Sequence, residues 1–237
     1  MKIQCFRKIT LSTWLRFSII STLLFLIATA VLAGPPLICH SFDIGSAKSL
    51  PWISHSWNLS GAETYDTSKL ANDTISILAA DHTVLVHMET LRRATLYARK
   101  DPAAAKQLLT RITMGTKTAQ PSNDSQALTY FDTGYLAEAY KQWLGDASHN
   151  PAAGLDGYAL IKEAIQLRGN DPQMELAAAL VTQSGPASEH QAHAQKAIAG
   201  AKSDPLLARN LASHFIGNEG QTIAEMLTKT TVAEQKP

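Results

Sequence analysis

The chain has little charge, little cysteine and, beyond its first 33 residues, no long hydrophobic run. Only 17% of its 237 residues are charged, and the formal net charge is +1. The basic residues are scattered among acids, so the sequence lacks the basic patch by which proteins bind nucleic acid. No apolar stretch after Ala33 is long enough to span a bilayer. We therefore expect no nucleic-acid binding and no membrane-embedded body.

The motifs of common catalytic and cofactor sites are also missing. The sequence has no Gly-x-Ser-x-Gly elbow of a serine hydrolase and no glycine-rich phosphate loop, because Gly45 and Gly61 stand alone. It has no Asp-rich calcium loop and no His-Glu-x-x-His zinc motif. These absences favour a protein without a cofactor and without catalytic activity.

The first 33 residues have the pattern of an export signal. Residues 1–16 carry four basic side chains and no acid, and residues 17–33 carry no charge. The run ends in Val31-Leu32-Ala33, and a helix-hostile Gly-Pro-Pro follows it. This order predicts a signal peptide over residues 1–33 that is cleaved between Ala33 and Gly34. The expected location is periplasmic or extracellular, most simply in a bacterial envelope.

Two alternatives to cleavage stay open. Seventeen apolar residues in a helix span about 26 Å, slightly less than the roughly 30 Å hydrocarbon core, so a retained anchor is compatible with the length. We expect membrane attachment only if the signal segment is retained as an anchor. Lipid modification of Cys39 is the other alternative, although Ile38 is not the small residue that a lipobox has before its cysteine.

Cleavage changes both the charge and the cysteine content. Removing four basic residues and no acid takes the formal charge from +1 to −3, and Cys5 leaves with the signal. Cys39 is then the single thiol of the exported chain, so no intramolecular disulfide can form. We expect this thiol to be buried and inert, paired with another chain, or used chemically.

Residues 34–64 differ in composition from the rest of the chain, and we call them the arm. The arm is rich in glycine, proline and serine, yet it also contains large apolar residues that disordered linkers lack. We expect an irregular segment whose apolar side chains dock on the body. These side chains are Leu37, Ile38, Phe42, Ile44, Trp52, Ile53 and Trp57.

Residues 65–228 show the three- and four-residue apolar spacing of amphipathic helices, and no strand-like alternation. Several predicted helices begin where an acid or amide that can cap a helix precedes a proline. A last short helix is expected over residues 222–227, and a polar tail over residues 229–237. The predicted helix starts are Asp101-Pro102, Asn150-Pro151, Asp171-Pro172 and Asp204-Pro205.

One pattern occurs three times within these helices. An alanine that permits close approach of a neighbouring helix precedes a capping Asp-Pro by seven residues. The last two copies are offset by 33 residues, and the first two by 70, about twice 35. The pairs are Ala94 with Asp101, Ala164 with Asp171, and Ala197 with Asp204.

A period near 34 residues with two helices per unit resembles a tetratricopeptide-repeat array, over residues 81–216. The stretches 135–140 (YLAEAY) and 164–167 (AIQL) resemble the helices of that family. The resemblance implies an all-α fold, a short array of helical hairpins that presents a surface to another chain. An unrepeated helical bundle is the alternative. The arm, from Gly34 to Trp52, resembles the start of uncharacterised exported bacterial proteins, which implies no activity.

Aromatic residues are denser between residues 130 and 158 than elsewhere. Exposed aromatic side chains on a helical array suit binding of a peptide or protein, whereas buried ones pack the core. We take five of them as candidate partner-binding residues, with core packing as the alternative. They are Tyr130, Tyr135, Tyr140, Trp143 and Tyr158.

Cys39 and His40 form the second candidate site. Adjacent thiol and imidazole groups, with Asp43 and His55 nearby in sequence, suggest a metal ligand set or a thiol of lowered pKa. However, neighbouring side chains of an extended segment point to opposite faces. The alternative, which we favour, is a buried Cys39 that behaves as a small hydrophobe and anchors the arm.

The remaining histidines form no complete site. His190 and His193 share a helix face, but two histidines are too few for zinc, and we expect a solvated face. His82 and His87 diverge on a helix, and His214 borders an apolar stripe. The sequence as a whole predicts an exported, non-catalytic interaction or scaffold module for a protein or peptide. The alternatives are a thiol- or metal-dependent module that uses Cys39-His40, and a helical domain anchored by an uncleaved signal.

Overall fold

The structure is a computed structural model, and it describes residues 35–52, 58–59, 63–115, 123–145 and 150–214. Several predicted features lie outside the described residues. They are the signal segment with its Ala33–Gly34 cleavage site, Ile53, His55 and Trp57 of the arm, the short helix at 222–227 and the tail at 229–237.

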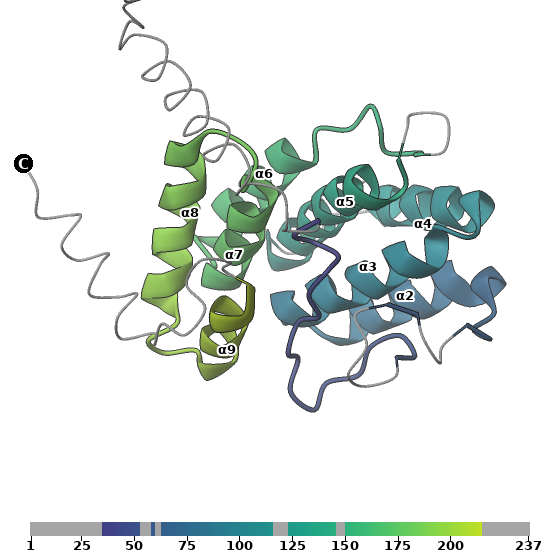
Figure 1. Cartoon of the computed structure of the whole chain (residues 1–237), viewed down its shortest axis with the longest axis horizontal. Helices are drawn as coiled ribbons and strands as arrows, with labels where there is room; N and C mark the ends of the chain where they lie inside the picture. The colour runs from purple at the N-terminus through teal and green to yellow at the C-terminus, as the bar shows by residue number, and fades with distance from the viewer. Residues whose placement is uncertain (1–34, 53–57, 60–62, 116–122, 146–149, 215–237) are drawn as a thin grey trace, which may run out of the picture. The chain divides into compact units, whose positions relative to one another are not determined.

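The described part of the chain is all-α, with no strand, as the sequence predicts (Figure 1). None of its helices combines the length and the apolar character needed to cross a bilayer. The elements are η1 (Thr67–Lys69), α2 (Leu70–Ala80), α3 (Val84–Ala98), α4 (Pro102–Gly115), α5 (Asn123–Trp143), α6 (Gly157–Arg168), α7 (Pro172–Val181), α8 (Ala187–Gly200) and α9 (Pro205–His214).

Three helices begin at the predicted Asp-Pro pairs. The Asp101 carboxylate accepts a hydrogen bond from the Ala104 N–H at the start of α4. The carboxylates of Asp171 and Asp204 do the same for main-chain N–H groups at the starts of α7 and α9. Each aspartate satisfies first-turn donors that have no partner within the helix, and the proline after it has no N–H to satisfy.

The fourth predicted start is wrong. Asn150-Pro151 opens a turn instead, in which the Asn150 side chain accepts a hydrogen bond from the Ala152 N–H. Helix α6 begins only at Gly157, where the Asp156 carboxylate accepts from the Ala159 N–H. The local side-chain bond of Asn150 stabilises a turn in place of a first helical turn.

Consecutive helices pack as hairpins. The most extensive contacts are those of α5 with α6 and of α7 with α8, and α2 also packs on α3 (Figure 1). Helix α3 packs in addition on α5, which does not follow it directly in the chain. Ala94, Ala164 and Ala197, the alanines of the repeated pattern, are completely buried. Helices α5 and α6 approach so closely that a Cβ atom built on Gly134 would lie 2.5 Å from the Gly157 carbonyl oxygen. Small residues therefore set the spacing of these helices.

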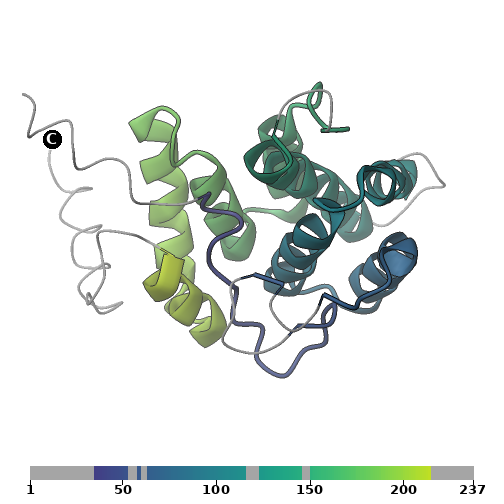
Figure 2. The ribbon, with the colours of Figure 1, turned by 45° about the vertical axis from the view of Figure 1, so that its right-hand side comes forward.

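The arm contributes to the same core as the helices. Leu37, Ile38, Phe42 and Leu50 are buried against side chains of the body. In Figure 2 the arm runs between α7–α9 on one side and α2–α5 on the other. Because helices and arm together surround α3, every residue of α3 except Arg93 is buried. The predicted docking of apolar arm residues is confirmed for Leu37, Ile38 and Phe42, and Ile44 and Trp52 are partly buried against the same core, whereas Leu50 was not predicted.

Candidate functional site

The arm is held mainly through its main chain, by side chains of the body that we call the arm-binding surface. This surface consists of Glu89, Arg92, Arg93 and Tyr97 of α3, Gln142 of α5, and Asn210 of α9. Near the beginning of the arm, the Leu37 N–H donates to Gln142 Oε1 at 3.0 Å. One residue later, the Ile38 carbonyl accepts from Arg92 Nη1 at 3.0 Å.

The middle of the arm makes three further main-chain bonds. The Phe42 N–H donates to Glu89 Oε2 at 2.9 Å. The Asn210 amide then pairs with both main-chain groups of Asp43: Oδ1 accepts from the N–H at 2.8 Å, and Nδ2 donates to the carbonyl at 2.9 Å. Such pairing is independent of the arm side chain at that position, because every residue except proline offers the same two groups.

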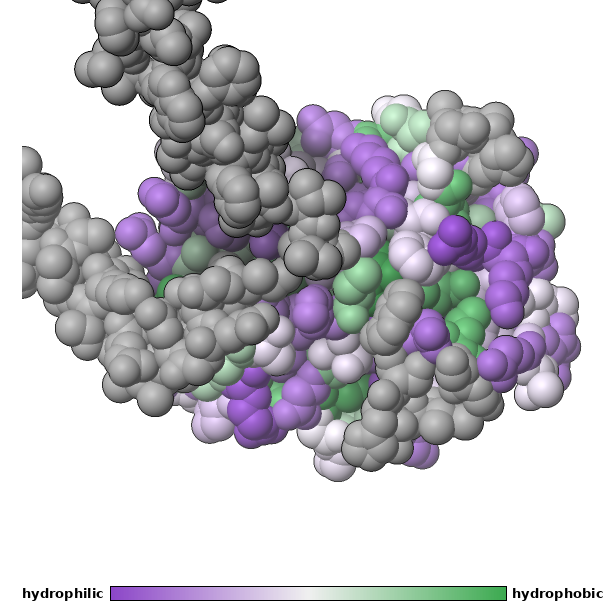
Figure 3. Space-filling model, viewed as in Figure 1, coloured by the Kyte–Doolittle hydropathy of each residue, from purple (hydrophilic) through white to green (hydrophobic). Residues whose placement is uncertain are grey.

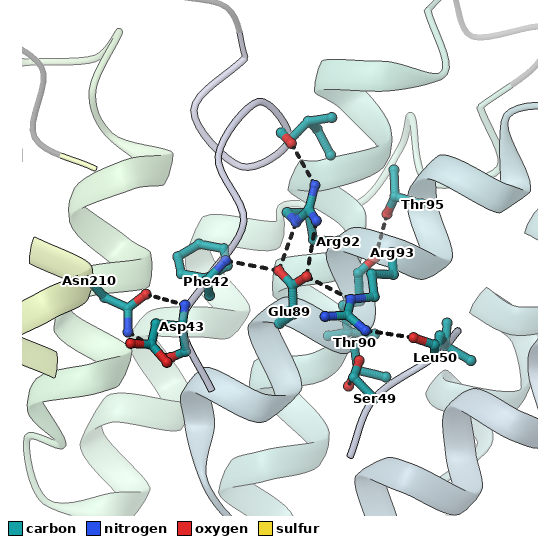
Figure 4. Close-up of polar contacts among 12 residues, drawn as sticks. Phe42, Asp43, Ser49, Leu50, Glu89, Thr90, Arg92, Arg93, Thr95 and Asn210 are labelled. Carbon is teal, nitrogen blue, oxygen red and sulfur yellow. Dashed lines mark hydrogen bonds and ion pairs between the residues drawn. The ribbon is translucent and has the colours of Figure 1, made fainter. Parts of the chain in front are cut away.

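Residues 50 and 51 of the arm are held in the same way. The Leu50 carbonyl accepts from Arg93 Nη1, and the Pro51 carbonyl accepts from the Tyr97 hydroxyl, both at 2.6 Å. Figure 4 shows three of the arm contacts around the Glu89 carboxylate: Glu89 with Phe42, Asn210 with Asp43, and Arg93 with Leu50. The body therefore binds an irregular polypeptide segment with turns at residues 35–39 and 44–47, and that segment is part of its own chain.

A buried charge cluster lies at the centre of the arm-binding surface. Glu89 and Arg92 are both fully buried, and the Arg92 guanidinium donates to the Glu89 carboxylate from Nε (2.7 Å) and Nη2 (3.0 Å). Arg93 Nε donates to the same carboxylate at 2.6 Å. With the Phe42 N–H, each Glu89 oxygen accepts two hydrogen bonds. The Trp52 ring of the arm covers both arginines, with its centre 4.7 Å from Arg92 Cζ and 5.5 Å from Arg93 Cζ.

Phe42 packs its ring on the imidazole of His214, at the end of α9. The two rings stack with centres 4.2 Å apart, and His40 meets the other side of His214 edge-on at 5.7 Å. His214 Nδ1 lies 2.9 Å from the Asn210 carbonyl, which can only accept, so Nδ1 carries a proton. Burial, together with the nearby His40, lowers the pKa of His214 to about 4, although the Asn210 carbonyl and Glu89 act to raise it. His214 is therefore neutral at physiological pH.

This burial predicts a loss of stability in acid. An unfolded histidine has a pKa of about 6.5, so below that pH the unfolded chain binds a proton that folded His214 excludes down to a pH of about 4. Stability is thus lost as the pH falls from about 6.5 to 4. Between pH 7 and pH 4.5, the free energy of unfolding of the wild type, measured with urea, should fall by about 2 kcal/mol more than that of His214→Phe. Equal losses in the two proteins would show that His214 does not titrate in this way.

Cys39 and His40 do not form the activated pair that the sequence suggested. Burial raises the pKa of the Cys39 thiol, and the nearby Arg92 lowers it less. Near neutral pH, the thiolate fraction of Cys39 is therefore smaller than that of a free cysteine. A reactive thiol has a larger thiolate fraction instead. In the described part of the chain, no three His, Cys, Asp or Glu side chains gather closely enough to hold a metal ion. The half-buried Cys39 fits the interpretation as an arm anchor.

The predicted aromatic binding set is wrong for Tyr135 and Tyr140. Both are completely buried within the core. The Tyr140 hydroxyl donates to the Ala105 carbonyl of α4 at 3.2 Å, and the Tyr135 ring lies 5.7 Å from that of Phe131. These side chains cannot reach a partner because α5 has neighbouring helices on several sides.

The other three aromatic candidates are half-buried and pack against the core. Tyr130 and Trp143 belong to α5, and Tyr158 belongs to α6. Arg99 covers the Trp143 ring, with Cζ 4.4 Å from its centre. The Tyr158 hydroxyl is instead 2.8 Å from His193 Nε2 of α8. The structure thus places them in separate local clusters, and their role in binding stays a prediction.

His193 and His190 are not on a solvated face, contrary to the sequence-based expectation. His193 Nδ1 bonds to the carboxylate of Glu175, a completely buried residue of α7, and Lys196 Nζ donates to the same carboxylate at 2.9 Å. His190 Nδ1 bonds to the Ala179 carbonyl of α7. Burial acts to raise the pKa of Glu175, but its bonds from His193 and Lys196 outweigh this and lower it. The cluster fastens α8 to α7.

A pocket of about 330 Å³ lies between α2, α4 and α5. His87 and Asp132 line it as a buried pair, with Nδ1 2.6 Å from the carboxylate and Nε2 2.7 Å from the Asp81 carbonyl. Burial acts to lower the pKa of His87, yet Asp132 and the Asp81 carbonyl raise it overall. Since both ring nitrogens are engaged, His87 has no free lone pair with which to accept a proton from a ligand.

The charge cluster of the arm-binding surface was not predicted from the sequence. A signal was present: residues 84–98 are hydrophobic on more than one side of a helix, which is typical of a buried helix. Glu89, Arg92 and Arg93 lie three and four apart inside that helix, so they had to be buried as a group. Asn210 and Gln142 gave no such signal.

Comparisons of the chain with known protein families, with curated proteins and with solved structures found no match.

Proposed function

We propose that this protein is an exported, non-catalytic interaction module whose helical body binds another polypeptide. The observation that carries the proposal is the set of main-chain hydrogen bonds from Gln142, Arg92, Glu89, Asn210, Arg93 and Tyr97 to the arm. A body that recognises the main chain of an irregular segment is equipped for protein recognition. The tetratricopeptide-like repeat pattern supports the same role, because such arrays present surfaces to other chains.

The proposal includes the location of the protein. We place it in a bacterial envelope, periplasmic or extracellular, after cleavage between Ala33 and Gly34, with membrane attachment only if the signal segment is retained. The basis is the order of charged, apolar and cleavable residues at the N-terminus. No nucleic acid and no cofactor belong to the proposed function.

In-cell photo-crosslinking tests this proposal on the full-length gene product. A photoreactive amino acid replaces one exposed residue at a time: Lys48 on the arm, Lys106 on α4 or Gln191 on α8. We expect at least one position to give a discrete adduct with one other polypeptide, identified by mass spectrometry. The recovered protein should begin at Gly34. Uncrosslinked monomer at all three positions, or a chain that retains residues 1–33 in the cytoplasm, would overturn the proposal.

A further inference from the structure

We infer that the arm is an internal ligand of the arm-binding surface, which a partner replaces with an irregular segment of its own. This inference rests on the proposed function and specifies its site and the class of its partner. The partner segment adopts the turn of residues 35–39 and carries two adjacent apolar residues, followed four positions later by an aromatic one. This is the pattern of Leu37, Ile38 and Phe42.

The surface beneath the arm has the chemistry of a binding site. Glu89, Arg92 and Asn210 are each completely buried, and each bonds to the arm main chain. A buried charge is costly unless it is paired and hydrogen-bonded, and here part of that hydrogen bonding comes from the main chain of the arm. When the arm leaves, water can solvate these charged and amide groups. Exposure of this surface therefore costs less than exposure of an apolar one of the same area.

The described surface offers a partner little apolar area elsewhere. Figure 3 shows hydrophobic residues in small areas among hydrophilic ones on the face that it presents. Among the residues that the structure describes, Met114 is the one large hydrophobic side chain that is exposed. Apolar contacts concentrate at the centre of stable protein interfaces. In the described part of the body, such contacts become available where Leu37, Ile38, Phe42 and Leu50 now lie.

The contacts also define which segments fit. The main-chain bonds accept any residue with an N–H, so proline is excluded at the positions of Leu37, Phe42 and Asp43. Side-chain selectivity comes from the completely buried positions of Leu37 and Ile38, and from the stack of an aromatic ring on His214. The exposed Asp43 carboxylate accepts from Arg209 Nε of α9 at 2.6 Å, so a carboxylate is favoured at that position.

Competition by the arm sets how tightly a free segment binds. A tethered segment acts at an effective concentration of roughly millimolar, so it keeps a free peptide of the same sequence out. A change that weakens only the arm must therefore raise the affinity for the free peptide. A change in the arm-binding surface must lower it.

The test uses the full chain from Gly34 and a fluorescent synthetic peptide of residues 35–52. Two arm variants leave the arm-binding surface intact: Phe42→Ala removes the stacked ring, and Asp43→Pro removes the N–H that bonds to Asn210. Circular dichroism monitors the folding of both variants. If Phe42→Ala reduces folding, Asp43→Pro replaces it in the test, because Asp43→Pro changes no buried side chain. We expect either variant to bind the peptide at least tenfold more tightly than the wild type, by fluorescence anisotropy.

Two controls separate binding at this surface from adhesion elsewhere. Asn210→Ala, added to either arm variant, should weaken peptide binding at least tenfold, because it removes both bonds to Asp43 of the peptide. A peptide with proline at position 43 should weaken it similarly. Equal binding to the wild type and the folded arm variants, or binding unaffected by Asn210→Ala, would overturn the inference. A partner crosslinked in cells would then still support the proposed function, at another surface.

Discussion

Replacing Glu89 with alanine should lower the free energy of unfolding by about 3–5 kcal/mol, the largest single-residue effect that we expect. The change takes the carboxylate away from Arg92 and Arg93 and leaves the Phe42 N–H without its acceptor. Arg92 is completely buried, so its charge would remain in the interior without the counter-ion. The measurement is urea unfolding at pH 7, followed by circular dichroism.

Two comparisons identify the cause of that loss. Lys69 pairs with Asp66 at the same three-residue spacing, but on the surface, so Lys69→Ala should change stability by less than about 0.5 kcal/mol. Replacing Glu89 and Arg92 together by methionine should cost less than Glu89→Ala, because the completely buried Arg92 charge is removed with its partner, and Arg93, whose side chain is 15% exposed, keeps its bond to the Leu50 carbonyl. A loss below about 1 kcal/mol for Glu89→Ala would mean that water reaches Arg92.

The second large effect is expected at Gly134. Its alanine variant places a Cβ atom 2.5 Å from the Gly157 carbonyl oxygen and 3.0 Å from Ile161 and Leu160 side-chain atoms. The nearest of these is main chain, so α5 and α6 must separate to admit it. We expect a loss of about 1–3 kcal/mol, even though alanine favours a helix by about 1 kcal/mol over glycine. Thermal and urea unfolding both report this loss.

Gly154 provides the matched control. A Cβ atom at Gly154 has no neighbour within 4 Å, and its φ is not positive. Gly154→Ala should therefore change the free energy of unfolding by less than about 0.5 kcal/mol. Equal stability of Gly134→Ala and Gly154→Ala would contradict the close contact between α5 and α6.

The parts of the fold that the sequence predicted depend on local physics. Asp101, Asp171 and Asp204 satisfy N–H groups within three residues of themselves, so each helix start can be recognised without tertiary information. Asn150 fails as a start for an equally local reason, since its side chain closes a turn. The hairpin arrangement follows from buried alanines at a repeated spacing.

The missed parts depend on residues distant in sequence. The apolar periodicity of α5 alone places Tyr140 outside the buried stripe of that helix. In the structure, α4 covers Tyr140. The arm-binding surface combines side chains of α3, α5 and α9, and no periodicity relates them. What the sequence did indicate was an arm with too many apolar residues to stay in water.

The bond between Asp43 and Asn210 has a consequence for the order of folding. These residues are 167 positions apart, and the chain is synthesised from its N-terminus. The arm is therefore made first, but it cannot complete its contacts until α9 has formed. In the meantime Leu37, Ile38 and Phe42 remain available to chaperones and proteases. Completion of the arm contacts thus requires α9, and it closes the fold by joining its earliest described segment to its latest.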